Sequence, residues 1–239
     1  LKGGGLAAGY KGDFTMDAEA ADPWPDMSSV VAHGHIMLGM NSPRALDRVE
    51  INTDLTAQGR MFPGGFAGSV TLTANHAGGE TTVTFDLARD QRHMASVQAR
   101  LSEADQRVTG KWKIDLRDAD VAPFASQAAL PAIVAAGEGS FNSDAALAQV
   151  HVLGHLEMAA ARLEVLAPWL ARVGPVTFST KFDVTSRGRT LRVEALEVSL
   201  AGSHPVATAR ALQAFDFNLD TSDLHFAGPA SEWLHVTVQ

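Results

Sequence analysis

The chain has 239 residues, of which 46% are hydrophobic and 19% charged, with a mean hydropathy close to zero. These values are typical of a folded globular chain rather than a disordered one. The formal net charge of −8 disfavours a nucleic acid partner, and the lack of cysteine excludes disulfides, thiolate metal sites and cysteine nucleophiles.

Alternation of apolar and polar residues dominates the first half of the chain. It occurs in residues 10–18, 30–40, 48–57, 68–75, 82–87, 95–101 and 108–117. Successive side chains of a strand point to opposite sides, so each segment predicts a strand with one apolar and one polar face. Such alternation is typical of antiparallel sheets. Short polar or glycine-bearing links at 61–65, 76–79, 89–91 and 103–106 predict hairpins between these strands.

Two stretches of the second half break this pattern. Residues 121–136 are rich in alanine, and residues 163–173 end before Gly174, so both predict short helical segments. Their similarity suggests a weak internal repeat over 121–158 and 159–200. In the second stretch Leu163, Leu166, Leu170 and Val173 share one helical face, and Pro168 is expected to split the element. We expect it to cover apolar surface of the sheet, with Trp169 at its edge.

Strands are again predicted at 139–143, 150–156, 176–184, 191–200, 207–219, 224–226 and 234–238. Between Leu191 and Leu200 the apolar phase slips by one residue, which predicts a β-bulge near Ala195. The predicted fold is therefore mainly β: a long antiparallel meander of about twelve strands with two short helices. We expect residues 1–239 to form a single β-rich segment of a larger protein.

Histidines and carboxylates form no clear catalytic pattern. His33 and His35 lie on the polar side of their predicted strand, and His151 and His155 also share a face, so a solvated outer face explains them. Carboxylates are scattered over the same polar faces, and the common nucleophile, phosphate-loop, dinucleotide and zinc-protease motifs do not occur. We predict no enzyme activity, no metal site and no cofactor.

The apolar face of the meander must be covered by something. The residues that we expect to line it are Val70, Leu72, Val83, Phe85, Val97, Trp112, Ile114, Phe178 and Phe182. A second sheet could cover this lining and make a closed sandwich. Alternatively, the sheet could curl into an open groove that contacts an apolar ligand such as lipid acyl chains. Small lining residues such as Gly68 and Ala95 fit both arrangements.

Two passages resemble a known family. Residues 163–184 contain Leu163-Glu-Val-Leu-Ala-Pro168 followed by an alternating segment, and residues 191–202 alternate and close on Gly202. They are similar to the bacterial AsmA-like proteins, a group that includes TamB, in which a short helix of this kind precedes a strand. Residues 121–136 fit the same pattern loosely.

The resemblance implies a periplasmic β-sheet folded into an elongated hydrophobic groove and tethered to the inner membrane by a segment outside this chain. It implies a non-enzymatic function, in which the groove binds phospholipid or another apolar ligand. Such proteins move lipid between membranes or support outer-membrane assembly, with envelope membrane proteins as partners. The alternative is a structural or adhesive β-sandwich that acts through its polar outer surface.

Overall fold

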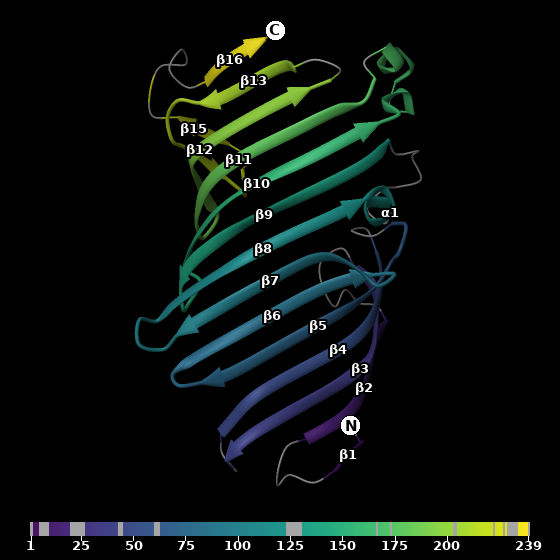
Figure 1. Ribbon diagram of the computed structural model, residues 1–239, viewed down its shortest axis with the longest axis vertical. Coiled ribbons are helices and arrows are strands. Elements are labelled where there is room, and N and C mark those ends of the chain that lie inside the picture. The colour runs from purple at the N-terminus through teal and green to yellow at the C-terminus, as the bar shows by residue number, and fades with distance from the viewer. Residues whose placement is uncertain are drawn as a thin grey trace. The chain divides into compact units, whose positions relative to one another are not determined.

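The alternating segments of the sequence form long antiparallel strands in the computed structural model (Figure 1). The structure describes residues 2–4, 10–19, 27–42, 45–59, 63–122, 131–165, 167–172, 174–202, 205–221, 223–226, 228 and 234–238. The chain divides into two units. Unit 1 comprises Leu1–Ala104 and Asp118–Leu130, and unit 2 comprises Asp105–Arg117 and Pro131–Gln239.

Unit 1 is an antiparallel meander. Its described strands are β1 (Lys2–Gly4), β2 (Tyr10–Glu19), β3 (Met27–Ser42), β4 (Ala45–Gly59), β5 (Phe66–Ala77), β6 (Glu80–Arg89) and β7 (Arg92–Ser102). Each strand pairs with the next along the chain. Met61 and Phe62 of the predicted link at 61–65 lie outside the described residues.

Two of the predicted hairpin turns of unit 1 are confirmed, between β5 and β6 and between β6 and β7. Gly78 and Gly79 both have positive φ, at 60° and 78°. Asp90 and Gln91 also have positive φ, at 50° and 63°. Two consecutive positive φ values give the two-residue turn whose twist matches that of the flanking strands. These turns fix which residues of β5, β6 and β7 lie opposite one another.

The most buried side chains of unit 1 lie at one end of its strands. Val30, Ala57 and Phe66 are register neighbours on β3, β4 and β5 and are 2%, 3% and 7% exposed. At the same end, helix α1 (Asp118–Val121) is attached through two arginines that flank the turn between β6 and β7. Arg89 Nη1 donates to the Ala119 carbonyl at 2.6 Å. Arg92 pairs with the buried carboxylate of Asp120.

Unit 2 is also a meander, but it forks at its last long strand. Its described strands are β8 (Arg107–Arg117), β9 (Ala132–Asp144), β10 (Gln149–Ala161), β11 (Val176–Arg187), β12 (Thr190–Ala201), β13 (Pro205–Ala211), β14 (Phe215–Asn218), β15 (Leu224–Phe226) and β16 (Leu234–Val238). Strands β8 to β12 pair in chain order. The first part of β12 pairs with β14, and the second part pairs with β13.

A β-bulge lies at this fork, as the sequence predicted. Asp183 pairs with Ala195 whereas Val184 pairs with Val193, so Glu194 is an extra residue in β12. The extra residue returns the following apolar side chains to the face that Leu191 and Val193 occupy. It also separates the part of β12 that pairs with β14 from the part that pairs with β13.

The prediction of short helical segments over 163–173 is confirmed, but the helices are of the 3-10 type rather than α-helices. The segment contains two short 3-10 helices, η2 (Leu163–Val165) and η3 (Pro168–Arg172), and the break before Pro168 matches the expected split. Trp169 is 71% exposed. Leu166, Val173 and the side chain of Leu170 lie outside the described part, so the expected apolar face of this element stays a prediction.

The prediction of helix over 121–136 is wrong from Ala132 onward, where β9 begins. Residues 123–130 lie outside the described part of the chain. Alanine favours helices, but in β9 Ala135 pairs with Leu116 of β8 and Met158 of β10. These cross-strand contacts override the local preference, because strand preference depends mainly on packing against neighbouring strands.

The strands differ from the prediction in two further places. The segment 207–219 is two strands, since β13 ends at Ala211 and β14 begins at Phe215. The break lets the two strands pair with different parts of β12. Lys2–Gly4 forms a strand that the sequence did not predict.

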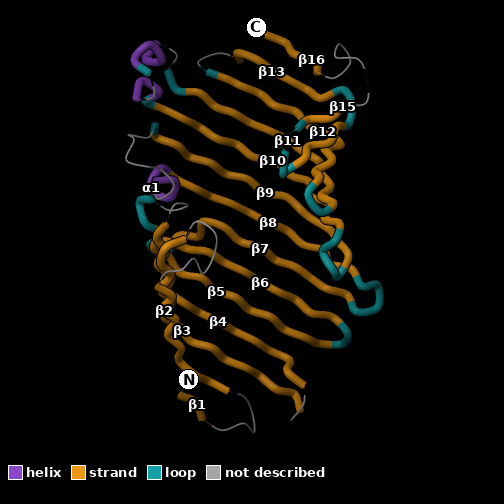
Figure 2. Tube along the Cα trace, turned by 180° about the vertical axis from the view of Figure 1, so that it is seen from behind, coloured by secondary structure: helices purple, strands orange, loops and turns teal. Residues whose placement is uncertain are grey.

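Each unit is an open sheet with almost no helix, and its strands lie side by side in Figures 1 and 2. Two stacked sheets would bury the side chains between them. In the described part of either unit, no large side chain is fully buried. The structure therefore favours the open sheet over the closed sandwich. No helix in the described ranges is long and apolar enough to cross a membrane.

Candidate functional site

The predicted lining of unit 1 forms a set of neighbours on one face. Leu72, Phe85 and Val97 are register partners on β5, β6 and β7. Val70 and Val83 each lie two residues from one of these positions along a strand, so they point to the same side. All five side chains are half-buried. The face is therefore apolar and partly open to solvent.

The face extends to two residues that were missing from the predicted lining. Ile51 pairs with Leu72, and Ile36 pairs with Ile51, so β3 and β4 continue the same row. Both isoleucines are half-buried. The alternation within each strand could have indicated their side, but their position in the row depends on the register between strands.

The opposite side of unit 1 is polar. Thr84 and Gln98 face each other on β6 and β7 and are exposed. His33 and His35 are exposed on β3, as expected for an outer face. The two faces of this sheet therefore differ clearly in polarity.

In unit 2, two of the predicted lining residues contact each other across four strands. Trp112 of β8 is in register with Gly139, Gly154 and then Phe182 of β11. The glycines leave space for the indole: a Cβ at Gly139 or Gly154 would lie 2.8 or 2.5 Å from its ring carbons. The Trp112 and Phe182 rings stack, with centroids 6.0 Å apart and 16° between their planes.

The other two predicted residues of unit 2 lie on the same face. Ile114 follows Trp112 by two positions on β8, and Phe178 precedes Phe182 by four positions on β11. Both are half-buried. The row that contains Ile114 continues through Leu156 of β10, which the sequence analysis did not single out.

Two buried polar atoms on this face have no hydrogen-bond partner in the described part of the chain. They are Trp112 Nε1 and Thr180 Oγ1. Thr180 lies between Phe178 and Phe182 along the same side of β11. A buried donor without a partner costs about 1–3 kcal/mol. Thr180 is not among the predicted lining residues because its side chain is polar, although the two-residue period places it on this side.

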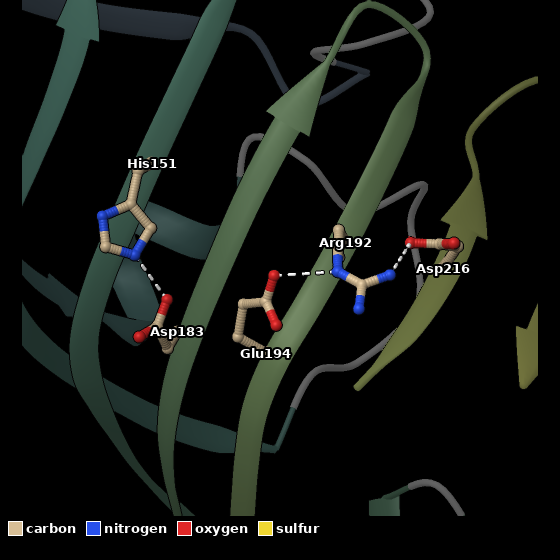
Figure 3. Close-up of polar contacts among 5 residues, drawn as sticks. All are labelled: His151, Asp183, Arg192, Glu194 and Asp216. Carbon is tan, nitrogen blue, oxygen red and sulfur yellow. Dashed lines mark hydrogen bonds and ion pairs between the residues drawn. The ribbon is translucent and has the colours of Figure 1, made fainter. Parts of the chain in front are cut away.

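The polar face of unit 2 carries a row of hydrogen-bonded and ion-paired side chains (Figure 3). His151 Nε2 of β10 lies 2.5 Å from Asp183 Oδ1 of β11. Arg192 Nε donates to Glu194 Oε1 at 2.8 Å, and its Nη1 lies 3.5 Å from Asp216 Oδ1 of β14. The pairs thus follow one another from β10 to β14, next to the bulge.

This charged row is suited to stabilising the sheet rather than to binding a metal. The paired side chains are 28–47% exposed, and exposed pairs of this kind contribute at most about 1 kcal/mol each. Among the described residues, no three or more histidines and carboxylates form a group that could hold a metal ion.

The apolar faces are thus the most unusual feature of the described residues. Comparison with known proteins adds no identity: no family model, no curated protein and no solved structure matches the chain. The function must therefore be inferred from the chemistry of these two faces and from the resemblance of the passages at 163–184 and 191–202.

Proposed function

We propose that this chain is a non-enzymatic segment of a lipid-binding β-sheet, in which the apolar face of each unit contacts acyl chains of phospholipid or another apolar ligand. We place it in the periplasm of a bacterial envelope, tethered to the inner membrane by a segment outside this chain. There it would move lipid between membranes or support outer-membrane assembly, together with envelope membrane proteins.

The observation that carries this proposal is the half-buried apolar row of Leu72, Phe85 and Val97, with Trp112, Phe182 and their neighbours in unit 2. Large exposed apolar patches are uncommon on soluble monomers and usually mark an interaction site. Covering the part of one such side chain that is still exposed gains about 0.5–1 kcal/mol. An acyl chain that covers several of them therefore gains several kcal/mol against the entropy lost on binding.

The resemblance to AsmA-like proteins supports the same conclusion, since it implies a long apolar groove. The alternative of an adhesive β-sandwich needs a second layer over the apolar face. In the described part of each unit, the strands form no such layer and no large side chain is fully buried. The lipid-binding proposal therefore has the better support.

Photo-crosslinking tests the proposal by comparing neighbouring positions on the apolar and the polar face of each sheet. Benzoylphenylalanine would be placed at Phe85 or Ile114, which are half-buried on the apolar faces, and at Thr84 or Lys113, which are exposed on the polar faces. After irradiation of bacterial cells and purification, mass spectrometry should detect lipid attached at Phe85 and Ile114. The controls at Thr84 and Lys113 should carry little or none.

Equal labelling at the two sides would contradict a lipid-binding face, because it would indicate unspecific contact with membrane. A lack of lipid at all four positions would also overturn the proposal. Testing one pair in each unit shows whether both apolar faces bind.

A further inference from the structure

Trp112 has an unusual position for a side chain on an open apolar face. The ring atoms nearest to the Gly139 and Gly154 positions are Cε2 and Cζ2, and Cε2 is bonded to Nε1. The N–H donor therefore lies close to the backbone of β9 and β10. Backbone carbonyls of a sheet lie within its plane and bond to neighbouring strands, so they offer no acceptor above the sheet.

The same part of the face holds a second polar atom without a partner. Thr180 Oγ1 is buried, and Thr180 is two residues from Phe182, against which the Trp112 ring stacks. Each of these two buried polar groups needs a hydrogen-bond partner. Nothing in the described part of the chain supplies one to either atom.

We propose that Trp112 covers an acyl-chain subsite floored by Gly139 and Gly154, and that a bound ligand displaces the indole and accepts hydrogen bonds from Trp112 Nε1 and Thr180 Oγ1. The glycines leave room for a polymethylene chain once the ring moves aside. Phe182, Ile114 and Leu156 provide its apolar surroundings. This inference rests on the proposed function and specifies the ligand chemistry at one place.

The ligand class follows from the charge of the site. At every position of the apolar row from Ile114 through Leu156 to Thr180, and of the row from Trp112 to Phe182, the residues are uncharged. A carboxylate would be buried without a cation, which is costly, whereas a neutral ester carbonyl is not. The subsite therefore takes the part of a neutral acyl lipid where the acyl chain joins its ester group.

The test uses Trp112 itself as the reporter in the full chain. Replacing Trp24, Trp169 and Trp233 with phenylalanine leaves Trp112 as the single tryptophan. The probes are vesicles of phosphatidylcholine with bromine on the acyl chains, because bromine quenches tryptophan fluorescence on contact. One preparation has ester-linked chains and the other has ether-linked chains, which lack the carbonyl acceptor.

We expect the ester lipid to quench Trp112 with an apparent affinity about 25-fold higher than the ether lipid, which is about five-fold for each of the two hydrogen bonds that the ester carbonyl accepts. Thr180→Val should weaken binding of the ester lipid about five-fold and leave the ether lipid unchanged. The matched control is Thr177→Val, on the exposed, opposite side of β11. It should bind like the parent chain, and circular dichroism should show both variants folded.

A second variant tests the inference independently of Thr180→Val. Trp112→Phe keeps an aromatic ring but removes the donor, so crosslinking of ester lipid at Ile114 should fall while that of ether lipid should not. The inference is wrong if ester and ether lipids quench alike, or if Thr180→Val and Thr177→Val behave alike. If Phe85 captures lipid and Trp112 is never quenched, the subsite is wrong but the proposed function stands. If no position captures lipid, both the subsite and the proposed function are wrong.

Discussion

At the scale of single residues, Arg92 contacts one of the most buried carboxylates described in the chain. Asp120 is 2% exposed and pairs with Arg92, whose side chain is 23% exposed. Removing one partner of a buried ion pair costs about 3–5 kcal/mol, because the other charge is left in an apolar environment. Arg92→Met should therefore lower the free energy of unfolding by about 3 kcal/mol, measured by urea denaturation.

The matched control for Arg92 is Arg100→Met. Arg100 pairs with Glu80 within the same unit, but these side chains are 59% and 40% exposed. Exposed pairs contribute about 1 kcal/mol or less, so this variant should unfold almost like the parent chain. Equal losses in the two variants would show that the buried pair does not attach α1 to β6 and β7.

At this scale the sequence predicts only on which side of a strand a residue lies, because the two-residue period determines that side. The period places Leu72, Phe85 and Val97 on one side, and the structure agrees. It does not indicate that Trp112 spans two glycines to reach Phe182, because that contact depends on the register across β9 and β10. Pairs between distant segments, such as Arg92 with Asp120, cannot be predicted from the sequence for the same reason.

At the scale of elements, the bulge at Glu194 decides which face of β12 is apolar. Deleting Glu194 would shift the following residues by one position, turning Leu196, Val198 and Leu200 towards the polar side. We expect loss of the pairing between β12 and β13 and a large drop in stability. Hydrogen exchange should show faster exchange in residues 196–200 and 205–211, and urea denaturation should show a lower midpoint.

Substitution at the same position gives the control for the deletion. Glu194→Ala keeps the register and removes one exposed contact to Arg192, so its effect should stay below about 1 kcal/mol. If the deletion is tolerated as well as the substitution, the bulge does not set the register of β12.

Elements with strong alternation were predicted well, and those with ambiguous composition were not. The bulge could be predicted because a phase slip in an alternating strand has few other structural solutions. The alanine-rich composition of residues 132–136 predicts helix at the start of β9, whereas its pairing with β8 and β10 depends on tertiary contacts. Likewise, the break between β13 and β14 reflects pairing with two parts of β12.

At the scale of the whole molecule, the sequence predicted an apolar face but not what covers it. Alternation indicates that one side of each strand is apolar and must be covered. A second sheet and a ligand could cover it equally well. The choice between them depends on how successive strands are placed in space. In both units the strands continue edge to edge, so the lining stays half-buried, and the proposed lipid would supply the missing layer.

Single charges on the apolar faces test this arrangement in each unit. Leu72→Asp in unit 1 and Ile114→Asp in unit 2 place a carboxylate at half-buried positions, where it keeps part of its hydration. Both variants should therefore stay folded by circular dichroism, yet capture much less lipid from a crosslinker at Phe85 or Phe178 of the same unit.

Thr84→Asp and Thr109→Asp, on the exposed polar faces, should change neither property. Wholesale unfolding of both lining variants would mean that a packed layer covers these residues, and lipid would then have no access to them.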